Sequence, residues 1–254
     1  MIRPLVFVDL DDTLFQTRQK CPVAETAHLT QATTARNDNH SFMTRPQKAV
    51  IEWMLASADV IPVTARGSDA FRNVHLPFAC GAVLANGGVL TRPDGSPDAE
   101  WTAVMSRDLA PMAASLERCL ADCRAAATGL NLDIRSWIVT EDGLSIYVVF
   151  KDNADATGAG LPSLAKAAPP PPDWTIHRNG NNLAFIPGVV SKARAVAHLI
   201  ERAKDENPAR PILGFGDSES DFGFLSLCDL WGAPARSQIA TTLEQSLADS
   251  ADRG

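Results

Sequence analysis

The chain has 254 residues, of which 45% are hydrophobic and 21% are charged, and its formal net charge is −7 at pH 7. This composition is typical of a globular protein that is long enough for one large domain or for a core with an insertion. The acidic balance, without a long run of Lys or Arg, argues against non-specific nucleic-acid binding. An anionic substrate would therefore be held by a metal ion or by a few local cations.

Membrane insertion and export are not expected from the sequence. No segment approaches the roughly 18 continuous apolar residues of a membrane span, and the opening letters MIRP lead into an apolar run without the pattern of a secretion signal. The cysteines are odd in number and form no CxxC pair, so we expect them all to be reduced and the protein to be cytoplasmic. They are Cys21, Cys80, Cys119, Cys123 and Cys228.

The first part of the chain alternates strand and helix patterns. The run PLVFVD predicts a strand that is buried on both faces. Residues 16–44 show little periodicity, and we expect a long irregular stretch there, of unassigned role. A helical pattern at 45–58 precedes two more strands, DVIPVTAR and CGAVLANGGVL, the second with a tight turn at 86–88. This order predicts a parallel sheet with crossover helices.

A different pattern occupies residues 91–185, which we expect to form an inserted α+β domain. Apolar residues recur at helical spacing over 101–127, and two hairpins follow, around the turns EDG and NGN. A helix between the hairpins is stopped by the proline run 169–172. From residue 191 the first pattern returns with a helix, the strand PILGFGD and a last helix. We therefore predict an α/β core formed by 1–90 and 186–254.

Polar residues that suit phosphate chemistry stand where predicted strands end. Asp9, Thr64 and Asp217 each end a strand, and the carboxyl ends of parallel strands share one edge of a sheet. Lys192 begins the helix that returns from the insertion and can reach the same edge. Phosphoryl transfer requires a nucleophile, oxygen ligands for a metal and cations for the phosphate oxygens. If the strands are neighbours, these four residues can supply that set.

Four stretches, in this order, resemble the motifs of the haloacid dehalogenase-like (HAD) superfamily. They are FVDLDDTLF, VIPVTAR, IPGVVSK and ILGFGDSESD. The insertion between the second and third stretches is similar to that of the Cof-like and sucrose-phosphatase-like subgroup. The resemblance implies a Rossmann-like parallel sheet with helices on both faces, plus a cap domain at 91–185. The chain departs from the family at Asp12, where Gly is usual, and in the third motif, where two glycines have moved or are absent.

The resemblance also implies catalytic roles. Asp9 would be the nucleophile that forms an aspartyl-phosphate. Asp11 would protonate the leaving group and then deprotonate the attacking water. Thr64 and Lys192 would hold the transferring phosphoryl oxygens. Asp12 is interpreted as a turn residue and receives no role.

Magnesium is the cofactor that the resemblance implies. Its ligands would be the carboxylates of Asp9 and Asp217 and the backbone carbonyl of Asp11. Asp221, one helical turn beyond Asp217, would orient either a metal-bound water or the ammonium group of Lys192. These four aspartates are the predicted metal site.

Substrate contacts are harder to assign from the sequence. Arg66 follows Thr64 and can either anchor a loop or contact the substrate. In this superfamily the cap contacts the leaving group, and the candidates near the second hairpin are Arg178, Asn181 and Asn182. The two asparagines can equally be turn formers.

We interpret the chain as a Mg²⁺-dependent phosphatase of a small phosphorylated metabolite, with a sugar phosphate as the expected substrate. Two alternatives remain open at this point. A phosphomutase of the same superfamily would return the phosphoryl group to a sugar. A catalytically silent protein would bind a phosphometabolite without turnover. Neither nucleic acid nor membrane is an expected partner, and the sequence does not indicate an oligomeric state.

Overall fold

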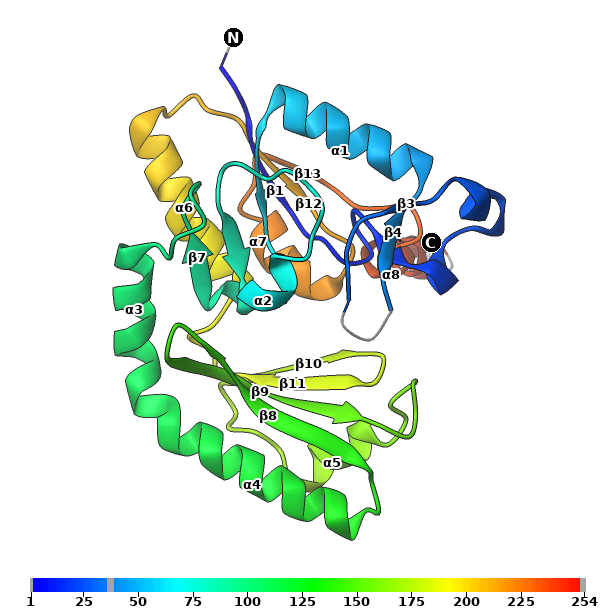
Figure 1. Cartoon of the computed structure of the whole chain (residues 1–254), viewed down its shortest axis with the longest axis vertical. Helices are drawn as coiled ribbons and strands as arrows, with labels where there is room; N and C mark the ends of the chain where they lie inside the picture. The colour runs from blue at the N-terminus through cyan, green and yellow to red at the C-terminus, as the bar shows by residue number, and fades with distance from the viewer. Residues whose placement is uncertain (1, 36–38, 252–254) are drawn as a thin grey trace. The chain divides into compact units, whose positions relative to one another are not determined.

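The computed structural model describes residues 2–35 and 39–251. The chain folds into two compact units, one formed by Met1–Asp98 with Ser191–Gly254 and the other by Ala99–Val190 (Figure 1). The first unit contains three of the four motif stretches in full and the last two residues, Ser191 and Lys192, of the stretch IPGVVSK. The second unit overlaps the segment 91–185 that we predicted as an insertion, but it begins at Ala99 and ends at Val190.

A parallel sheet forms the centre of the first unit, with the strand order β13-β12-β1-β5. The strands are β1 (Leu5–Val8), β5 (Asp59–Pro62), β12 (Ile212–Phe215) and β13 (Leu230–Gly232). In the register, Val8 of β1 lies between Phe215 and Pro62, so β1, β12 and β5 end at the same edge. All four residues of β1 are buried, as expected for an apolar strand in the middle of a parallel sheet.

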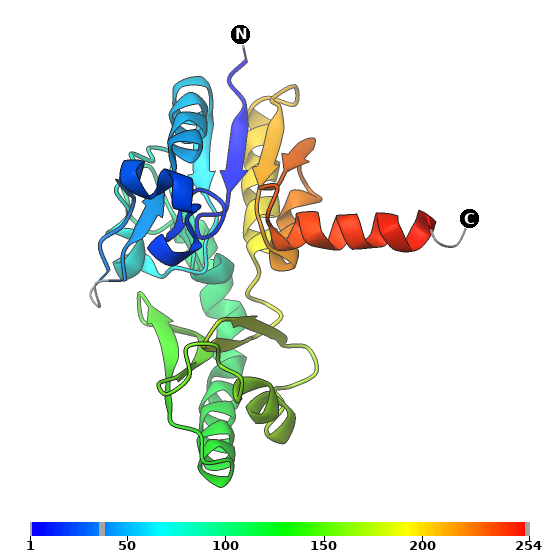
Figure 2. The same cartoon turned by 90° about the vertical axis from the view of Figure 1, so that its right-hand side faces the viewer.

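Helices cover both faces of this sheet, as predicted (Figure 2). Helix α1 (Arg45–Ser57) packs through Ile51 and Met54 against Val6 and Val8. It begins with a capping box between Thr44 and Gln47, which satisfies backbone donors of its first turn. Helices α6 (Lys192–Glu206) and α7 (Phe222–Leu225) cover the other face, preceded by the short helix η5 (Glu219–Asp221). The α/β class is therefore confirmed.

The stretch 16–44 is more regular than the sequence indicated. It contains three short strands in the order β2-β4-β3, namely β2 (Gln16–Thr17), β3 (Thr30–Gln31) and β4 (Ser41–Met43). Two 3₁₀ helices, η1 (Arg18–Lys20) and η2 (Val23–His28), lie between β2 and β3. The expectation of an irregular stretch was wrong for the strands because two or three residues are too few to show a period of two.

A hairpin follows the short helix α2 (Ser68–Phe71) beside the end of β5. Its strands are β6 (Ala82–Leu84) and β7 (Val89–Thr91), and the 3₁₀ turn η3 (Ala85–Gly87) joins them. The predicted tight turn is therefore present. The backbone N–H of Thr64 donates to the carbonyl of Val83 at 2.9 Å, which attaches the hairpin to the chain that leaves β5.

The second unit is an antiparallel sheet with helices on one face. Its strands, in the order β10-β11-β9-β8, are β8 (Ile134–Glu141), β9 (Leu144–Asp152), β10 (Thr175–Asn179) and β11 (Asn182–Ile186). The helices are α3 (Ala99–Leu109), η4 (Ala110–Met112), α4 (Ala113–Gly129) and α5 (Leu161–Ala167). Both predicted hairpins are present. The single helical run predicted over 101–127 is interrupted at η4, where Pro111 cannot donate a helical hydrogen bond.

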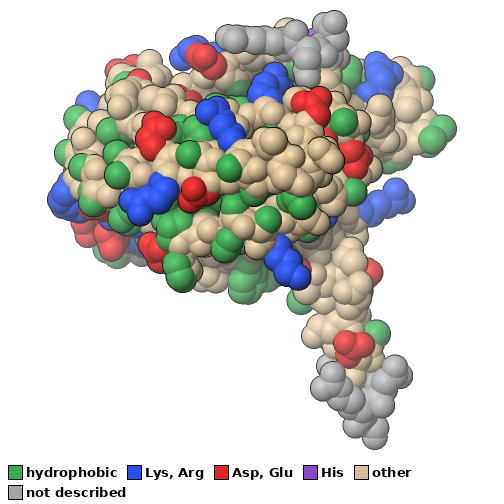
Figure 3. Space-filling model, turned by 90° about the horizontal axis from the view of Figure 1, so that it is seen from below, with side chains coloured by type: hydrophobic (Ala, Val, Ile, Leu, Met, Phe, Trp, Pro, Cys, Tyr) green, Lys and Arg blue, Asp and Glu red, His purple; other side chains and the backbone are tan. Residues whose placement is uncertain are grey.

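The last helix, α8 (Gln238–Ala251), extends away from the core sheet (Figure 2). Its Leu243 and Leu247 side chains are 50% and 70% exposed, and Ile239 at its start is buried. On the face drawn in Figure 3, Lys and Arg side chains are separated by acidic and uncharged ones, so no positive stripe crosses that face. Among the described residues, no helix is both long and apolar enough to cross a membrane.

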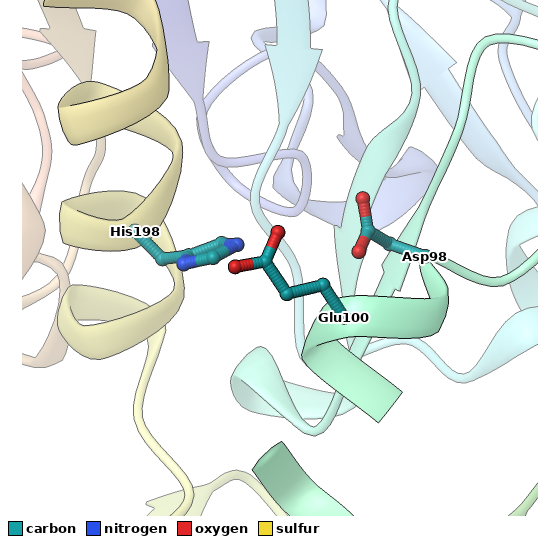
Figure 4. A group of neighbouring side chains, drawn as sticks. All are labelled: Asp98, Glu100 and His198. Carbon is teal, nitrogen blue, oxygen red and sulfur yellow. The ribbon is translucent and has the colours of Figure 1, made fainter. Parts of the chain in front are cut away.

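An ion pair connects helix α6 to Asp98, the last residue of the first segment of its unit. The guanidinium group of Arg202 donates to the carboxylate of Asp98 at 2.7 Å. Asp98 is buried, and its backbone N–H donates to the carbonyl of Leu90. Figure 4 shows three side chains: Asp98, His198 of α6, and Glu100 of the second unit. The pair links the point where the chain leaves the first unit to the helix by which it returns.

Candidate active site

The loop that follows β1 is closed by backbone hydrogen bonds. The N–H of Asp12 donates to the carbonyl of Phe15 at 2.7 Å, and that of Leu14 donates to Leu10 at 2.9 Å. Asp12 has a φ of 64°, in the left-handed region that favours glycine, which explains why Gly is usual at this place in the motif. The Asp12 carboxylate pairs with Lys20 at 2.5 Å. Asp12 is thus a turn residue, as interpreted from the sequence.

Lys192 connects two of the predicted aspartates. Its Nζ donates to Oδ1 of Asp9 at 2.6 Å and to Oδ1 of Asp221 at 2.7 Å. The N–H of Asp9 donates to the carbonyl of Phe215 at 2.8 Å, so the pairing of β1 with β12 fixes where this side chain begins. The structure therefore brings together three charged groups that are far apart in the sequence.

The position of Lys192 depends on the start of α6 and on a glycine in the η3 turn. Ser191 caps the helix by accepting from the N–H of Arg194 at 3.5 Å. Gly87 has a φ of 96°, and a Cβ built on it would lie 2.3 Å from the carbonyl oxygen of Ser191 and 3.0 Å from the nitrogen of Lys192. Only glycine allows this approach, and the turn therefore supports the backbone that carries the ammonium group.

Asp217 stands just beyond β12 and shares a hydroxyl donor with Asp9. The Oγ1 of Thr13 lies 3.1 Å from Oδ1 of Asp217 and 3.4 Å from Oδ2 of Asp9. Carboxylate oxygens of Asp9, Asp217 and Asp221 all lie within 4.8 Å of one another, and all three residues are buried. We assigned Thr13 no role from the sequence. Its place as the Thr of the DxDxT pattern in the first motif was the feature that could have indicated one.

Asp221 makes hydrogen bonds through both of its carboxylate oxygens. Oδ1 accepts from Lys192, and Oδ2 accepts from the backbone N–H and the hydroxyl of Ser218 at 3.1 and 2.8 Å. Gly216 makes room for it, because a Cβ there would lie 2.8 Å from the Cβ of Asp221. Of the two roles considered from the sequence, this geometry matches the orientation of the Lys192 ammonium group.

The charges of this buried cluster do not balance. With all four groups ionised, three carboxylates and one ammonium group sum to −2. Burial raises the pKa of Asp9 well above its ordinary value, and burial together with the charge of Asp221 raises the pKa of Asp217 to about 6. Burial also disfavours the charged form of Lys192, but the charges of Asp9 and Asp221 outweigh it and raise the pKa of Lys192. Burial disfavours the charged form of Asp221 as well, but Lys192 and the hydrogen bonds from Ser218 outweigh it and lower the pKa of Asp221. A divalent cation would bring the sum to zero, and carboxylate oxygens are the ligands that Mg²⁺ prefers.

Thr64 and Arg66 form the side of the site that comes from β5. Thr64 is buried, and its Oγ1 accepts from the backbone N–H of Arg66 at 3.1 Å. The guanidinium group of Arg66 donates through Nε and Nη2 to the two carboxylate oxygens of Asp11, both at 2.7 Å. The structure thus places Arg66 against Asp11, a contact between two motifs that sequence reasoning did not foresee.

The three candidates in the second unit do not share one surface. The side chain of Asn181 donates to the carbonyl of Asp152 at 2.8 Å, and that of Asn182 donates to Asn181 at 3.2 Å within the same turn. Arg178 pairs in register with Leu183, a residue of the helix-covered face, whereas Asn182 lies on the opposite face by the alternation of the strand. Asn181 and Asn182 thus act as turn residues here.

Comparison with known proteins bears on the fold. No protein-family model matches this sequence, and no curated protein matches it closely enough to count as a relative. Among solved structures, the chain is similar to the C-terminal domain of a trehalose-6-phosphate phosphatase from C. albicans, with a TM-score of 0.57 and 13% identity, covering 88% of this chain and 72% of that one. It is similar to a sucrose-phosphatase from Synechocystis in complex with sucrose and phosphate, with a TM-score of 0.54 and 14% identity, covering 96% and 97%.

A structure from Thermoplasma acidophilum matches at a TM-score of 0.54 and 16% identity, covering 94% of this chain and 87% of that one. The chain has the HAD-like fold. This is the fold that the resemblance of the four motifs implied. In this fold, the acidic cluster lies where β1 and β12 end and where α6 begins. At these identities the comparison establishes the fold alone.

Proposed function

We propose that the protein is a phosphatase that releases orthophosphate from a small phosphorylated metabolite. The observation that carries this proposal is the buried cluster in which Lys192 bridges Asp9 and Asp221 with Asp217 beside them. When its groups are ionised, the cluster has a charge of −2, which one divalent cation would neutralise. It also contains a carboxylate nucleophile and an ammonium group that can face a phosphate.

The residues present fit a magnesium ion. Asp9, Asp217 and the backbone carbonyl of Asp11 would hold it, and Lys192 and Ser218 already satisfy Asp221. When bound, Mg²⁺ supplies positive charge beside the buried carboxylates and polarises a phosphoryl oxygen. Burial and the charge of Asp221 raise the pKa of Asp217, and a cation held beside this carboxylate would lower it.

The chain's own residues account for both halves of the reaction. A carboxylate oxygen of Asp9 attacks phosphorus, the bond from phosphorus to the ester oxygen breaks, and Asp11 gives its proton to the departing alkoxide. Asp11 then takes a proton from water, the water oxygen attacks phosphorus, and the bond to Asp9 breaks to release orthophosphate. Lys192 and the hydroxyl of Thr64 would stabilise the phosphoryl oxygens during both displacements.

A sugar phosphate is the substrate class that we propose. Two of the similar structures are named as phosphatases of sugar phosphates, a sucrose-phosphatase and a trehalose-6-phosphate phosphatase. Such an ester has an alkoxide leaving group, which is a poor one. It therefore requires a proton donor, and Asp11 is available two residues after the nucleophile.

Phosphate release from a panel of phosphorylated metabolites, with and without Mg²⁺, tests the proposal. We expect turnover of at least one alkyl phosphate that is lost with a chelator and lost in Asp9→Asn. Asp69→Asn is the matched control, because Asp69 is an exposed acid of α2 that pairs with Arg72. Turnover in Asp9→Asn equal to that of the wild type, or no turnover across the panel, would contradict the proposal. Phosphoryl transfer between sugars without net phosphate release would instead indicate a phosphomutase.

A further inference from the structure

Among the described residues, the side chain of Asp11 is held by one partner, Arg66, from another part of the chain. Arg66 approaches it edge-on, and its Nε and Nη2 each donate to a different carboxylate oxygen at 2.7 Å. A paired contact of this kind fixes orientation as well as distance. The Asp11 side chain is 43% exposed, so little else restricts its rotation.

Arg66 is itself held rigidly. Its backbone N–H donates to Oγ1 of Thr64 at 3.1 Å, and its carbonyl accepts from Ala85 at 2.8 Å. Its guanidinium carbon lies 5.3 Å from the centre of the Phe15 ring, which is fully buried. This cation–π contact comes from the same loop that carries Asp11. Arg66 therefore fixes Asp11 relative to both β5 and the first-motif loop.

We propose that Arg66 is a positioning residue that acts on the reaction through Asp11, by aiming that side chain at the leaving group. This inference rests on the proposed phosphatase function. The two N–H groups that face Asp11 are occupied by it, which favours this role over direct binding of the substrate phosphate. A catalytic group that is free to rotate loses rate because its productive geometry is populated only part of the time.

The role predicts which kinetic constants change. The leaving oxygen of an alkyl phosphate needs a proton as the bond breaks, whereas p-nitrophenolate leaves without one. Loss of Arg66 should therefore lower kcat more for an alkyl phosphate than for p-nitrophenyl phosphate. KM should change little, because the phosphate contacts of Lys192 and Thr64 remain.

A double-mutant cycle with Asp11 tests this directly. The substrates are the best alkyl phosphate of the metabolite panel and p-nitrophenyl phosphate. We expect Arg66→Gln to lower kcat on the alkyl phosphate by about tenfold or more with KM within about twofold. In an Asp11→Asn background, the same change should cost less than about twofold, because its effect passes through the missing carboxylate. Arg66→Lys, which keeps the charge but not the paired contact, should lie between wild type and Arg66→Gln.

Arg72→Gln is the control, since Arg72 is an exposed residue of α2 that contacts none of these groups. An equal loss of rate in both backgrounds, or a KM raised by about tenfold on both esters, would overturn the inference and make Arg66 a substrate-binding residue. Those results require an active wild type, so they leave the phosphatase proposal intact. A wild type that hydrolyses neither ester would overturn both.

Discussion

Asp217 illustrates a conflict between binding and folding at a single residue. Burial and the nearby charge of Asp221 raise its pKa to about 6. Because the folded state binds this proton more tightly than the unfolded chain does, stability falls as pH rises from about 4 through 6. We expect Asp217→Asn to stabilise the metal-free protein at pH 7.5 by up to about 3 kcal/mol. Urea unfolding in the presence of a chelator, repeated across this pH range, measures the difference.

The difference between variant and wild type should grow between pH values of about 4 and 6 and then level off. Addition of Mg²⁺ should reverse the order at pH 7.5, because only the wild type retains the carboxylate that holds the ion. A variant that is less stable than the wild type at pH 7.5 without metal would show that Asp217 is already compensated by the protein.

Gly87 is the residue on which the position of Lys192 depends. Alanine there would place a methyl group 2.3 Å from the carbonyl of Ser191, so the backbone at the start of α6 would have to move. We expect Gly87→Ala to lower kcat by about tenfold or more and stability by about 2 kcal/mol. Steady-state kinetics and urea unfolding of the same preparation measure both effects.

Gly95→Ala is the matched comparison for this prediction. Gly95 has a φ of 80°, so alanine there is strained in the same way, but nothing lies within 4 Å of the added Cβ. This variant should lose about 1 kcal/mol of stability and none of its activity. Equal kinetics in the two variants would show that the turn does not support Lys192.

At the level of elements, whether a helix or strand was predicted correctly depends on the length of its sequence pattern. The hairpin strands of 5–9 residues and the long helices were foreseen because each repeats its apolar spacing, and the first strand was foreseen because it is a short continuous apolar run. Strands β2, β3 and β4 were missed because each has only two or three residues, which is too few to show a period of two. The break at Pro111 was missed because the apolar spacing continues on both sides of it.

A buried leucine in one helix and an exposed leucine in another lead to a prediction about stability. Leu116 of α4 is fully buried in the core of the second unit, whereas Leu247 of α8 is 70% exposed. We expect Leu116→Ala to cost about 2–5 kcal/mol of unfolding free energy and Leu247→Ala less than about 0.5 kcal/mol. Circular dichroism during urea unfolding compares the two. A large loss in Leu247→Ala would mean that α8 packs against something in solution.

At the scale of the whole molecule, the acidic cluster belongs to one unit. Every residue of it lies in the unit formed by Met1–Asp98 and Ser191–Gly254. We expect Mg²⁺ to slow amide hydrogen exchange in β1 and β12 and to leave β8 and β9 unchanged, because ligand binding protects the structure that it requires. Exchange measured by mass spectrometry with and without the ion checks this. Equal protection of β8 and β9 would show that the second unit also takes part in binding.

Most of the candidate site could be predicted because its residues end strands or begin a helix, and strand topology alone brings such positions together. This holds for Asp9, Lys192 and Asp217. The contact between Arg66 and Asp11 could not be predicted, since it depends on side-chain directions in two loops. Thr13 could have been identified as the Thr of the DxDxT pattern, but its hydrogen bonds to Asp9 and Asp217 depend on side-chain directions in the turn.

The pairing of β1 with β12 joins the beginning of the chain to residues 212–215. During synthesis, Asp9 and Thr64 leave the ribosome long before Lys192 and Asp217 do. A nascent chain that ends within the second unit therefore contains a nucleophile but neither its ammonium partner nor the remaining carboxylates. A premature stop codon before Asp217 should consequently abolish turnover completely.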